Sequence, residues 1–523
     1  MLVIFGGFFF YLYKQDKTSA VLSFFKSLIN SFILYSIVIS VNFFVVKNSI
    51  TCILLMEGTL LNHPSLIIGK LVLSLLGVLF LSAAYLDAAH NKFTAIELPF
   101  LLGIILWLFI FSLYCFNFIV LFLLMEAITL LVVVSNTLYF VFTGPKLIKP
   151  LIQFFILNLL MSTFYLLGVA LLLYVVPDAG AYTLSYGNIW NAFQSLCQDT
   201  VLGVALEMSA FLMYFKLTIS FMLITFVFKL TLAPFSIWVV SVYSNLPFLF
   251  LFLIMTIYKI VYALLFLRLF VNVLGYIDVL HVFWQNVIFL FVVPSMFVGC
   301  LAYRSQDLKT ILAYTTISQM GYVVGGFMVA NVDAIKFALI YLFVYSLQII
   351  GIFIIFLVLQ SKYNFTHLNQ LFLVKKYNKL YYYILITIFF SLAGIPPLSG
   401  FFTKFFLFLH IYDSGFFVIA ILGLISGFIM SLIYLQIVLQ LIVIKPSHTE
   451  IMQFEHSKKV LTTGTSTMTY NRIVYSLHCF LVGLYIFNFS FIFILPKVEY
   501  ISEVFVYGFI FFIITLVIGK WII

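Results

Sequence analysis

The stretch TFVFKLTLAPFSIW, residues 225–238, places Lys229 in an apolar run five positions before Pro234. The surrounding sequence stays apolar for about the 20 residues that a helix needs to cross the hydrocarbon core of a bilayer. A charged side chain is unfavourable at that depth, and a proline interrupts the helix that carries it. The stretch therefore predicts a transmembrane helix that is broken close to a buried charge.

Long apolar segments recur along nearly the whole chain. Of the 523 residues, 65% are hydrophobic and only 8% are charged, which is too few charges for an ordinary water-facing surface. The segments have the length of spanning helices rather than that of the alternating strands of a membrane barrel. We predict an all-α, polytopic membrane bundle of about 14–15 transmembrane helices.

Two of the expected spans, 209–243 and 380–411, exceed a single crossing by about ten residues, and both contain proline, at Pro234 and at Pro396-Pro397. We predict that both helices are broken there. No transit segment or cleavage pattern accompanies the first stretch, so we expect it to be retained. The expected spans lie near residues 2–13, 28–46, 66–86, 95–115, 118–142, 150–176, 209–243, 246–268, 286–303, 308–330, 335–359, 380–411, 416–444, 473–495 and 501–519.

Charges in the predicted loops separate by side. With each crossing reversing the direction, one side collects Lys146, Lys149, Arg304, Lys309, Lys362, Lys375, Lys376, Lys379, Lys445, Lys458, Lys459 and Arg472. The other side collects Asp178, Asp199, Glu207, Asp278, Asp333 and Asp413. Basic loops mark the cytoplasm or, in a mitochondrion, the matrix. The net charge of +10 is therefore an orientation signal and does not suggest nucleic acid.

Several classes of site are excluded by motif. The five cysteines lie far apart, with no CxxC or Cys/His cluster, which argues against zinc, haem or an iron–sulfur centre. Glycine-rich phosphate loops and a GxSxG elbow are also missing from the sequence. We therefore expect no metal and no cofactor on this chain.

Four charged residues fall inside predicted spans: Glu126, Lys229, Lys259 and Lys404. Each could snorkel to the interface or form a static pair. Four such residues, two of them beside helix breaks, instead favour a proton path, because a buried lysine with a movable carboxylate partner can release its proton. Lys216, Lys336, Arg268 and His410 lie toward span ends, and we expect them to be interfacial.

The breaks also divide the chain. The spans from 95–115 to 246–268 and from 286–303 to 416–444 each make five crossings, with the break in the fourth. An odd number of crossings inverts the second set, and broken helices in matching halves point to a transport site. We expect residues 1–94 to be N-terminal helices, 95–268 and 286–444 to be two inverted five-helix repeats joined by the loop 269–285, and 445–523 to form a C-terminal loop and helices.

Three stretches resemble a known family. FKLTLAPFSIWVVSVYSNLP (228–247), QDLKTILAYTTISQMGY (306–322) and LAGIPPLSGFFTKF (392–405) are similar, in this order, to motifs of the antiporter-like membrane subunits of respiratory complex I. The subunit 2 branch, called N-type in bacteria, is the most similar. Lys404 disfavours the sister subunit with glutamate there, and the short chain after residue 495 disfavours the sister with a long lateral helix.

The resemblance, which covers roughly residues 90–445 of the sequence, implies roles for the charged residues. Glu126 would be the carboxylate partner of Lys229, Lys259 the connecting relay and Lys404 the exit-side lysine. Ser236 and Gln319 stand where the family usually has histidine, which puts a relay through those positions in doubt.

The family further implies a proton-translocating subunit of NADH:ubiquinone oxidoreductase in the mitochondrial inner membrane, with basic loops facing the matrix. NADH, FMN, iron–sulfur clusters and ubiquinone would bind other subunits. The partners would be other membrane-arm subunits, accessory subunits and membrane lipids, with cardiolipin as one candidate. The alternatives are a subunit of a multisubunit cation/proton antiporter and a scaffold that pumps nothing.

Overall fold

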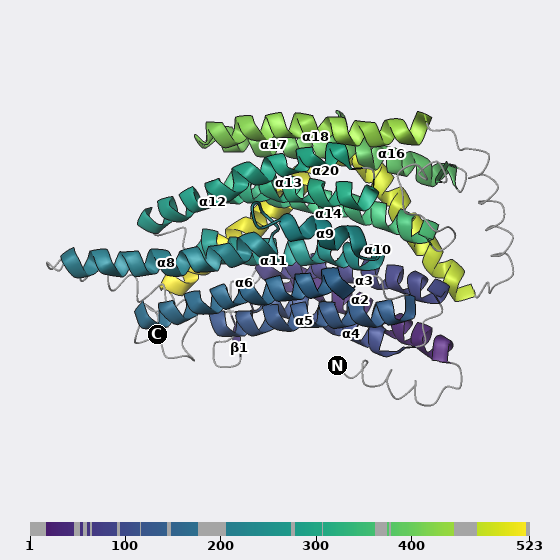
Figure 1. Ribbon diagram of the computed structural model, residues 1–523, viewed down its shortest axis with the longest axis horizontal. Coiled ribbons are helices and arrows are strands. Elements are labelled where there is room, and N and C mark those ends of the chain that lie inside the picture. The colour runs from purple at the N-terminus through teal and green to yellow at the C-terminus, as the bar shows by residue number, and fades with distance from the viewer. Residues whose placement is uncertain are drawn as a thin grey trace.

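The computed structural model is a bundle of long helices whose axes run roughly side by side (Figure 1). It describes residues 17–46, 53–55, 60–62, 65–91, 95–115, 117–143, 148–175, 205–273, 278–305, 307–360, 374–375, 378–443 and 468–518. The expected span at 2–13 lies outside these residues. Within them, nine helices are long and apolar enough to cross a membrane.

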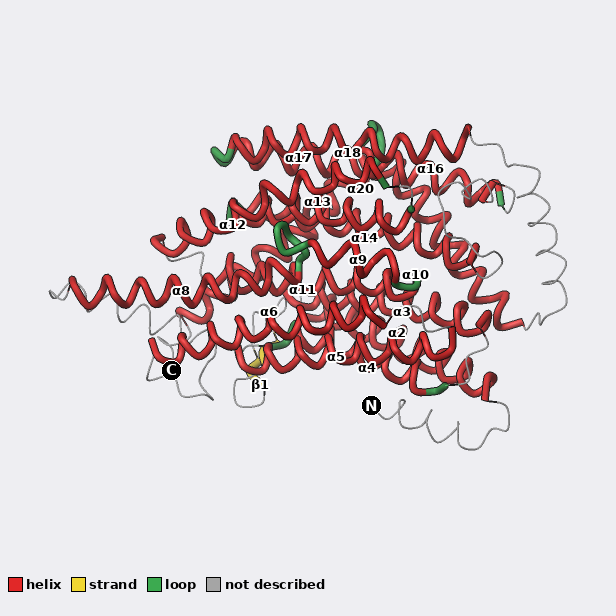
Figure 2. The backbone as a smooth tube through the Cα atoms, in the orientation of Figure 1, coloured by secondary structure: helices red, strands yellow, loops and turns green. Residues whose placement is uncertain are grey.

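Helix dominates because backbone N–H and C=O groups find no water in the hydrocarbon core and must bond within their own segment. Figure 2 shows helix throughout the bundle, with one small hairpin of β1 (Ile53–Leu55) and β2 (Leu60–Asn62). The predicted all-α polytopic class is confirmed. The main helices are α2 (Lys17–Val46), α3 (Ser65–Asn91), α4 (Glu97–Ser112), α5 (Phe118–Thr143), α6 (Ile148–Val175), α8 (Ala205–Lys229), α9 (Ile237–Asn245), α12 (Asp278–Val298), α13 (Leu308–Met328), α14 (Val332–Gln360), α16 (Lys379–Ala393), α17 (Ser399–Asp413), α18 (Phe417–Val443) and α20 (Met468–Ile518).

Both predicted helix breaks are present. The first separates α8 from α9 and contains Pro234, and the second separates α16 from α17 and contains Pro396 and Pro397. Each break has a residue in the left-handed region, Thr231 with φ 63° and Gly394 with φ 83°. That conformation is ordinary for glycine and strained for a β-branched threonine.

One segment lies at the centre of the bundle. It runs through α10 (Phe248–Phe252), η3 (Leu253–Tyr258), α11 (Lys259–Phe266) and η4 (Leu267–Val273), where η3 and η4 are π-helical. Its most apolar part, within Phe248–Val271, is completely buried, and the segment packs against α3, α8, α14 and α20. The expected span 246–268 therefore belongs to the interior of the protein.

The C-terminal region differs from the prediction. The expected spans 473–495 and 501–519 form one continuous helix, α20, of 51 residues. At 1.5 Å per residue it is about 77 Å long, more than twice the thickness of a bilayer core. It contacts α3, α14, α16 and α17, runs obliquely across the bundle and changes direction part-way (Figure 1). Pro496 lies inside α20, and proline commonly bends a helix without ending it; the expectation of two separate spans, 473–495 and 501–519, is wrong.

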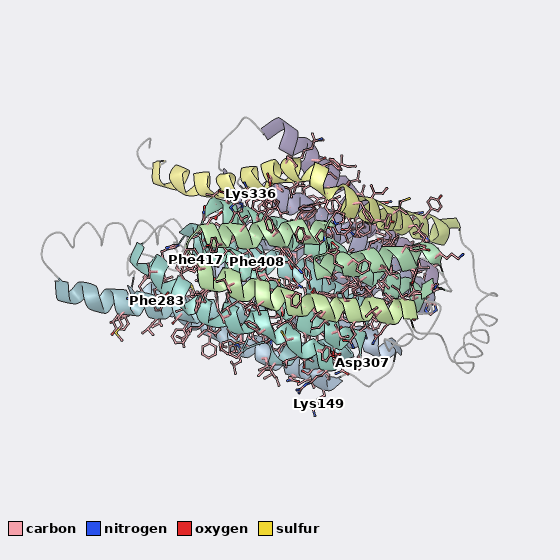
Figure 3. The ribbon with its side chains drawn as sticks, turned by 90° about the horizontal axis from the view of Figure 1, so that it is seen from above. Lys149, Phe283, Asp307, Lys336, Phe408 and Phe417 are labelled. Atoms are coloured by element: carbon pink, nitrogen blue, oxygen red, sulfur yellow. The ribbon has the colours of Figure 1, made fainter. Side chains whose placement is uncertain are left out.

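Five described residues beside predicted loops lie toward opposite ends of the bundle. In Figure 3, Lys149 and Asp307 lie near one end, and Phe283, Lys336 and Phe417 lie toward the other. Lys149 and Asp307 belong to loops on the predicted basic side, whereas the other three residues flank the acidic loops. We call these the basic end and the acidic end.

The second break is closed by a tight helix contact at Gly400, in the first turn of α17. A Cβ added to Gly400 would lie 1.9 Å from the backbone oxygen of Ser391, near the end of α16. Its N–H donates to Ser391 Oγ at 3.0 Å. Gly427 in α18, by contrast, has nothing within 4 Å of an added Cβ.

Gly400→Ala should therefore destabilise the protein. The methyl group would force α17 away from a backbone atom, at the upper end of the roughly 1–3 kcal/mol that overpacking usually costs. The measurement is the thermal unfolding midpoint and yield of the purified protein, with Gly427→Ala as the matched control. Equal stability of the two variants would contradict the contact.

Candidate functional site

Lys229 is the last residue of α8, immediately before the first break. It is 1% exposed, and its Nζ donates to Asn158 Oδ1 of α6 at 3.0 Å. The ring centroid of Tyr262 lies 5.6 Å from the same nitrogen. The ammonium group is thus enclosed by a neutral amide and an aromatic face.

Lys259 is the first residue of α11, in the central segment, and is also 1% exposed. Its Nζ donates to Thr231 Oγ1 at 2.9 Å. Thr231 belongs to the first break, two residues after Lys229. The break therefore connects the surroundings of two buried lysines.

Lys404, in α17, is partly buried and lies beside the second break. Its Nζ donates to the backbone oxygen of Leu392 at 2.6 Å. Leu392 lies in the last turn of α16, where carbonyl groups have no partner within the helix. The lysine supplies the donor that the interrupted helix lacks.

Glu126, in α5, is partly buried, and its Oε1 is buried with no hydrogen-bond partner among the described residues. The predicted pairing of Glu126 with Lys229 is not a direct contact. Among the described residues, the ion pair within 4.0 Å is that of Lys336 with Asp333. Glu126 and Lys229 still interact electrostatically. The structure brings all four predicted residues into the interior, with each lysine on a neutral oxygen.

Gln319 and Ser236 occupy the two positions where the resemblance predicts histidine. Gln319 is fully buried in α13; it accepts from Tyr341 Oη and donates to Tyr434 Oη at 3.4 Å, which links α13 to α14 and α18. Ser236 is the N-cap residue of α9, and its side chain makes no capping bond. Both positions hold neutral polar groups.

A chain of neutral side chains also surrounds the second break. Gln348 Nε2 donates to Ser391 Oγ at 2.5 Å, and Ser391 Oγ lies 3.1 Å from Ser399 Oγ. Ser399 Oγ donates to Asn488 Oδ1 of α20 at 2.6 Å. The long C-terminal helix therefore contributes a buried polar group beside the break.

The residues expected at the membrane interface have different surroundings in the structure. Arg268 is 3% exposed and donates to the Leu113 backbone oxygen at 2.8 Å, so it is buried within the protein beside the end of α4. The reason is that η4 continues beyond it to Val273, while the end of α4 offers a carbonyl. Lys336 pairs with Asp333 at 3.1 Å, and the His410 ring stacks on Phe337 with centroids 4.8 Å apart, both toward the acidic end.

Sequence reasoning missed two kinds of residue. Asn158 and Thr231 carry no charge, so nothing marked them before their lysine partners were placed. Lys70 and Asp87 of α3 are 2% and 7% exposed, and the test for charges inside spans would have identified Lys70. No three His, Cys, Asp or Glu side chains of the described ranges gather into a metal-binding group.

Comparison with known proteins places this arrangement in a family. Residues 115–430 match the family model described as NADH:quinone oxidoreductase/Mrp antiporter, TM. NADH-quinone oxidoreductase subunit N of Pelagibacter ubique is 28% identical over 269 residues, covering 51% of this chain and 56% of that protein. NADH-ubiquinone oxidoreductase chain 2 of Marchantia polymorpha is 32% identical over 221 residues, covering 42% and 44%. The chain thus spans about half the length of the curated relatives it matches.

Solved structures share the fold. A chain of the Mrp complex from Dietzia sp. aligns with a TM-score of 0.75 at 17% identity, covering 97% of this chain and 96% of that one. A chain of respiratory complex I from Thermus thermophilus aligns with a TM-score of 0.66 at 17% identity, covering 95% and 97%. With the family model matched over more than half of its residues, the chain belongs to the membrane-protein family of NADH:quinone oxidoreductase and Mrp antiporter subunits.

Proposed function

We propose that this protein is a proton-translocating membrane-arm subunit of respiratory complex I, NADH:ubiquinone oxidoreductase, in the mitochondrial inner membrane. The observation that carries the proposal is the setting of the buried lysines, each of which donates to a neutral oxygen. Its relatives named as complex I subunits support the choice of complex.

A neutral acceptor suits a lysine that changes protonation state. A carboxylate in direct contact stabilises the ammonium form and resists its deprotonation. An amide, hydroxyl or carbonyl oxygen accepts a hydrogen bond from either an ammonium group or a neutral amine, since both have N–H donors. The described lysine sites therefore satisfy the side chain before and after proton release.

Proton transfer would begin at Lys229. Approach of the Glu126 carboxylate favours the protonated lysine, and its withdrawal leaves the ammonium on Asn158, where release is easier. The hydrogen bond of Lys259 to Thr231 places Lys259 beside the same break, and in the proposal the proton moves through Lys259 to Lys404. Release from Lys404 occurs at the acidic end, toward which its helix α17 runs.

The driving reaction takes place elsewhere. NADH, FMN, iron–sulfur clusters and ubiquinone bind other subunits, and quinone reduction there supplies the energy. This chain has membrane-arm and accessory subunits as protein partners, with lipids such as cardiolipin around its apolar surface. Its basic end faces the matrix.

We also propose that 95–268 and 286–444 are inverted repeats, with 1–94, 269–285 and 445–523 outside them. One correspondence supports this division. In the first set Asn158 of the third helix binds Lys229 of the broken fourth helix, and in the second set Gln348 of the third helix binds Ser391 of the broken fourth helix.

A cation/proton antiporter is the second candidate, because the fold matches a chain of an Mrp complex as well as one of complex I. Purification of the native complex distinguishes the two. A complex I subunit should purify with flavin and iron–sulfur proteins, whereas an antiporter subunit should purify with small membrane proteins and no chromophore. The second result would refute the proposed complex.

Lys229→Met and Lys404→Met should each lower proton pumping per NADH oxidised. Methionine keeps much of the side-chain volume but leaves the acceptor unpaired, at a cost of about 1–3 kcal/mol, so the yield of assembled complex is measured for each variant. Proton uptake and quinone reduction are measured together in liposomes containing the assembled complex. Unchanged pumping in both variants would refute the relay and favour a scaffold.

Asn158→Asp should trap Lys229 as an ammonium group. The carboxylate would replace an amide oxygen 3.0 Å from Nζ, so pumping should fall while the complex stays assembled. Asn245→Asp, on an exposed residue at the end of α9, is the matched control. Pumping by Asn158→Asp at the level of this control would show that the neutral acceptor is unimportant.

A further inference from the structure

We propose that protons reach Glu126 from the basic end by a hydrated path that begins at Asp87 and follows one face of α5. The inference rests on the proposed function and assigns it an uptake route. Asp87 lies in α3, outside the family match of residues 115–430. The path uses groups that the lysine relay does not.

The entrance is a hydrogen-bonded cluster that reaches the surface. The exposed His90 has Nδ1 3.2 Å from Asn91 Oδ1. Asn91 Nδ2 donates to Asp87 Oδ1 at 3.0 Å, and it lies 3.4 Å from Tyr139 Oη of α5. Asp87 is 7% exposed, so the cluster connects solvent to a buried carboxyl group.

The position of Tyr139 on α5 shows at which end of the bundle the Asp87 cluster lies. Tyr139 lies one turn before the end of α5 at Thr143, and the next helix, α6, begins at Ile148 beside Lys149. Lys149 lies at the basic end of the bundle (Figure 3). Asp87 and its cluster therefore lie on the side from which a pumped proton is taken.

Polar residues of α5 connect this cluster to Glu126. Thr129, Asn136 and Tyr139 are 1%, 0% and 4% exposed. At 100° per residue, these three and Glu126 occupy an arc of about 140° on the helix, and Tyr139 lies about 20 Å along the axis from Glu126. The buried face thus carries a polar group at intervals through much of the bilayer core.

Three oxygens on this route have no hydrogen-bond partner among the described residues: Asp87 Oδ2, Asn136 Oδ1 and Glu126 Oε1. Buried polar atoms are nearly always bonded to protein or ordered water. Each of the three is an acceptor, so a water molecule that donates to it would complete its bonding, and further water between these points would complete the proposed path. The three unpaired oxygens are therefore the positions at which the proposed path would bind water.

Proton movement along such a row requires no oxidant or reductant. Asp87 takes a proton from a water molecule at the surface, forming one O–H bond as the O–H bond of that water breaks. Asp87 then gives a proton to the adjacent water, each water passes one on, and the last protonates Glu126. Every group returns to its starting state once Glu126 has transferred its proton.

The test measures protons pumped per NADH oxidised by the assembled complex in liposomes. Asp87→Asn, which cannot take up a proton, should lower that ratio as far as Glu126→Gln does, and Asp87→Glu should restore it. Asn136→Leu should lower it by removing a hydrated oxygen. Thr137→Val, on the exposed side of α5, is the matched control and should pump as the unmodified complex does.

The results separate the uptake path from the proposed function. Normal pumping in Asp87→Asn and Asn136→Leu, together with reduced pumping in Glu126→Gln and Lys404→Met, overturns the path and leaves the relay. Normal pumping in all four variants overturns both. Reduced pumping in all four, with Thr137→Val unaffected, supports both.

A labelling experiment on the unmodified complex covers the case in which Asp87→Asn fails to assemble. Carbodiimides react with protonated carboxyl groups in apolar surroundings, so Asp87 should be modified and pumping should fall in proportion. Peptide mass spectrometry locates the label. Modification of other carboxyl groups with Asp87 unlabelled would overturn its role in uptake.

Discussion

The hydrogen bond from Lys404 Nζ to the Leu392 carbonyl shows the constraint on which this structure depends. A helix broken inside a membrane exposes carbonyl groups that water cannot reach, and each needs a donor. A lysine at the same depth needs an acceptor for its N–H groups. Each supplies what the other lacks, which explains why charge and helix break occur together at Lys404; in the first break Lys259 finds its acceptor in the Thr231 hydroxyl.

The same constraint sets how far sequence can predict the site. Proline and lysine carry their signals locally, so the two breaks and the three buried lysines were identifiable without a structure. Asn158 was not, because it lies 71 residues from Lys229 in the chain and acquires its role only when α6 packs against α8. The two C-terminal spans were separated because Pro496 resembles a helix end, whereas α20 continues through it and packs against α3 and α14.

Neutral groups at the positions of Gln319 and Ser236 fit this pattern of lysines on neutral oxygens. Gln319 bonds to two tyrosine hydroxyls from two other helices, so it holds the packing of α13, α14 and α18 without carrying a charge. Glutamine cannot store a proton as histidine can. In the proposed relay, proton storage therefore falls to the lysines and carboxyl groups, and neutral polar groups and water would connect them.

The distribution of unsatisfied atoms gives the two halves of the path different characters. Along the lysines, donors are matched by oxygens of the protein, so each proton has a defined resting place. Along α5 and at Asp87, acceptors are left without protein donors in the part of the chain described. Acceptors without donors attract water and protons, whereas satisfied lysines hold a proton until their electrostatic surroundings change. Uptake by the first and controlled release by the second is the arrangement that a directional pump requires, because a path hydrated at both ends would let protons flow back.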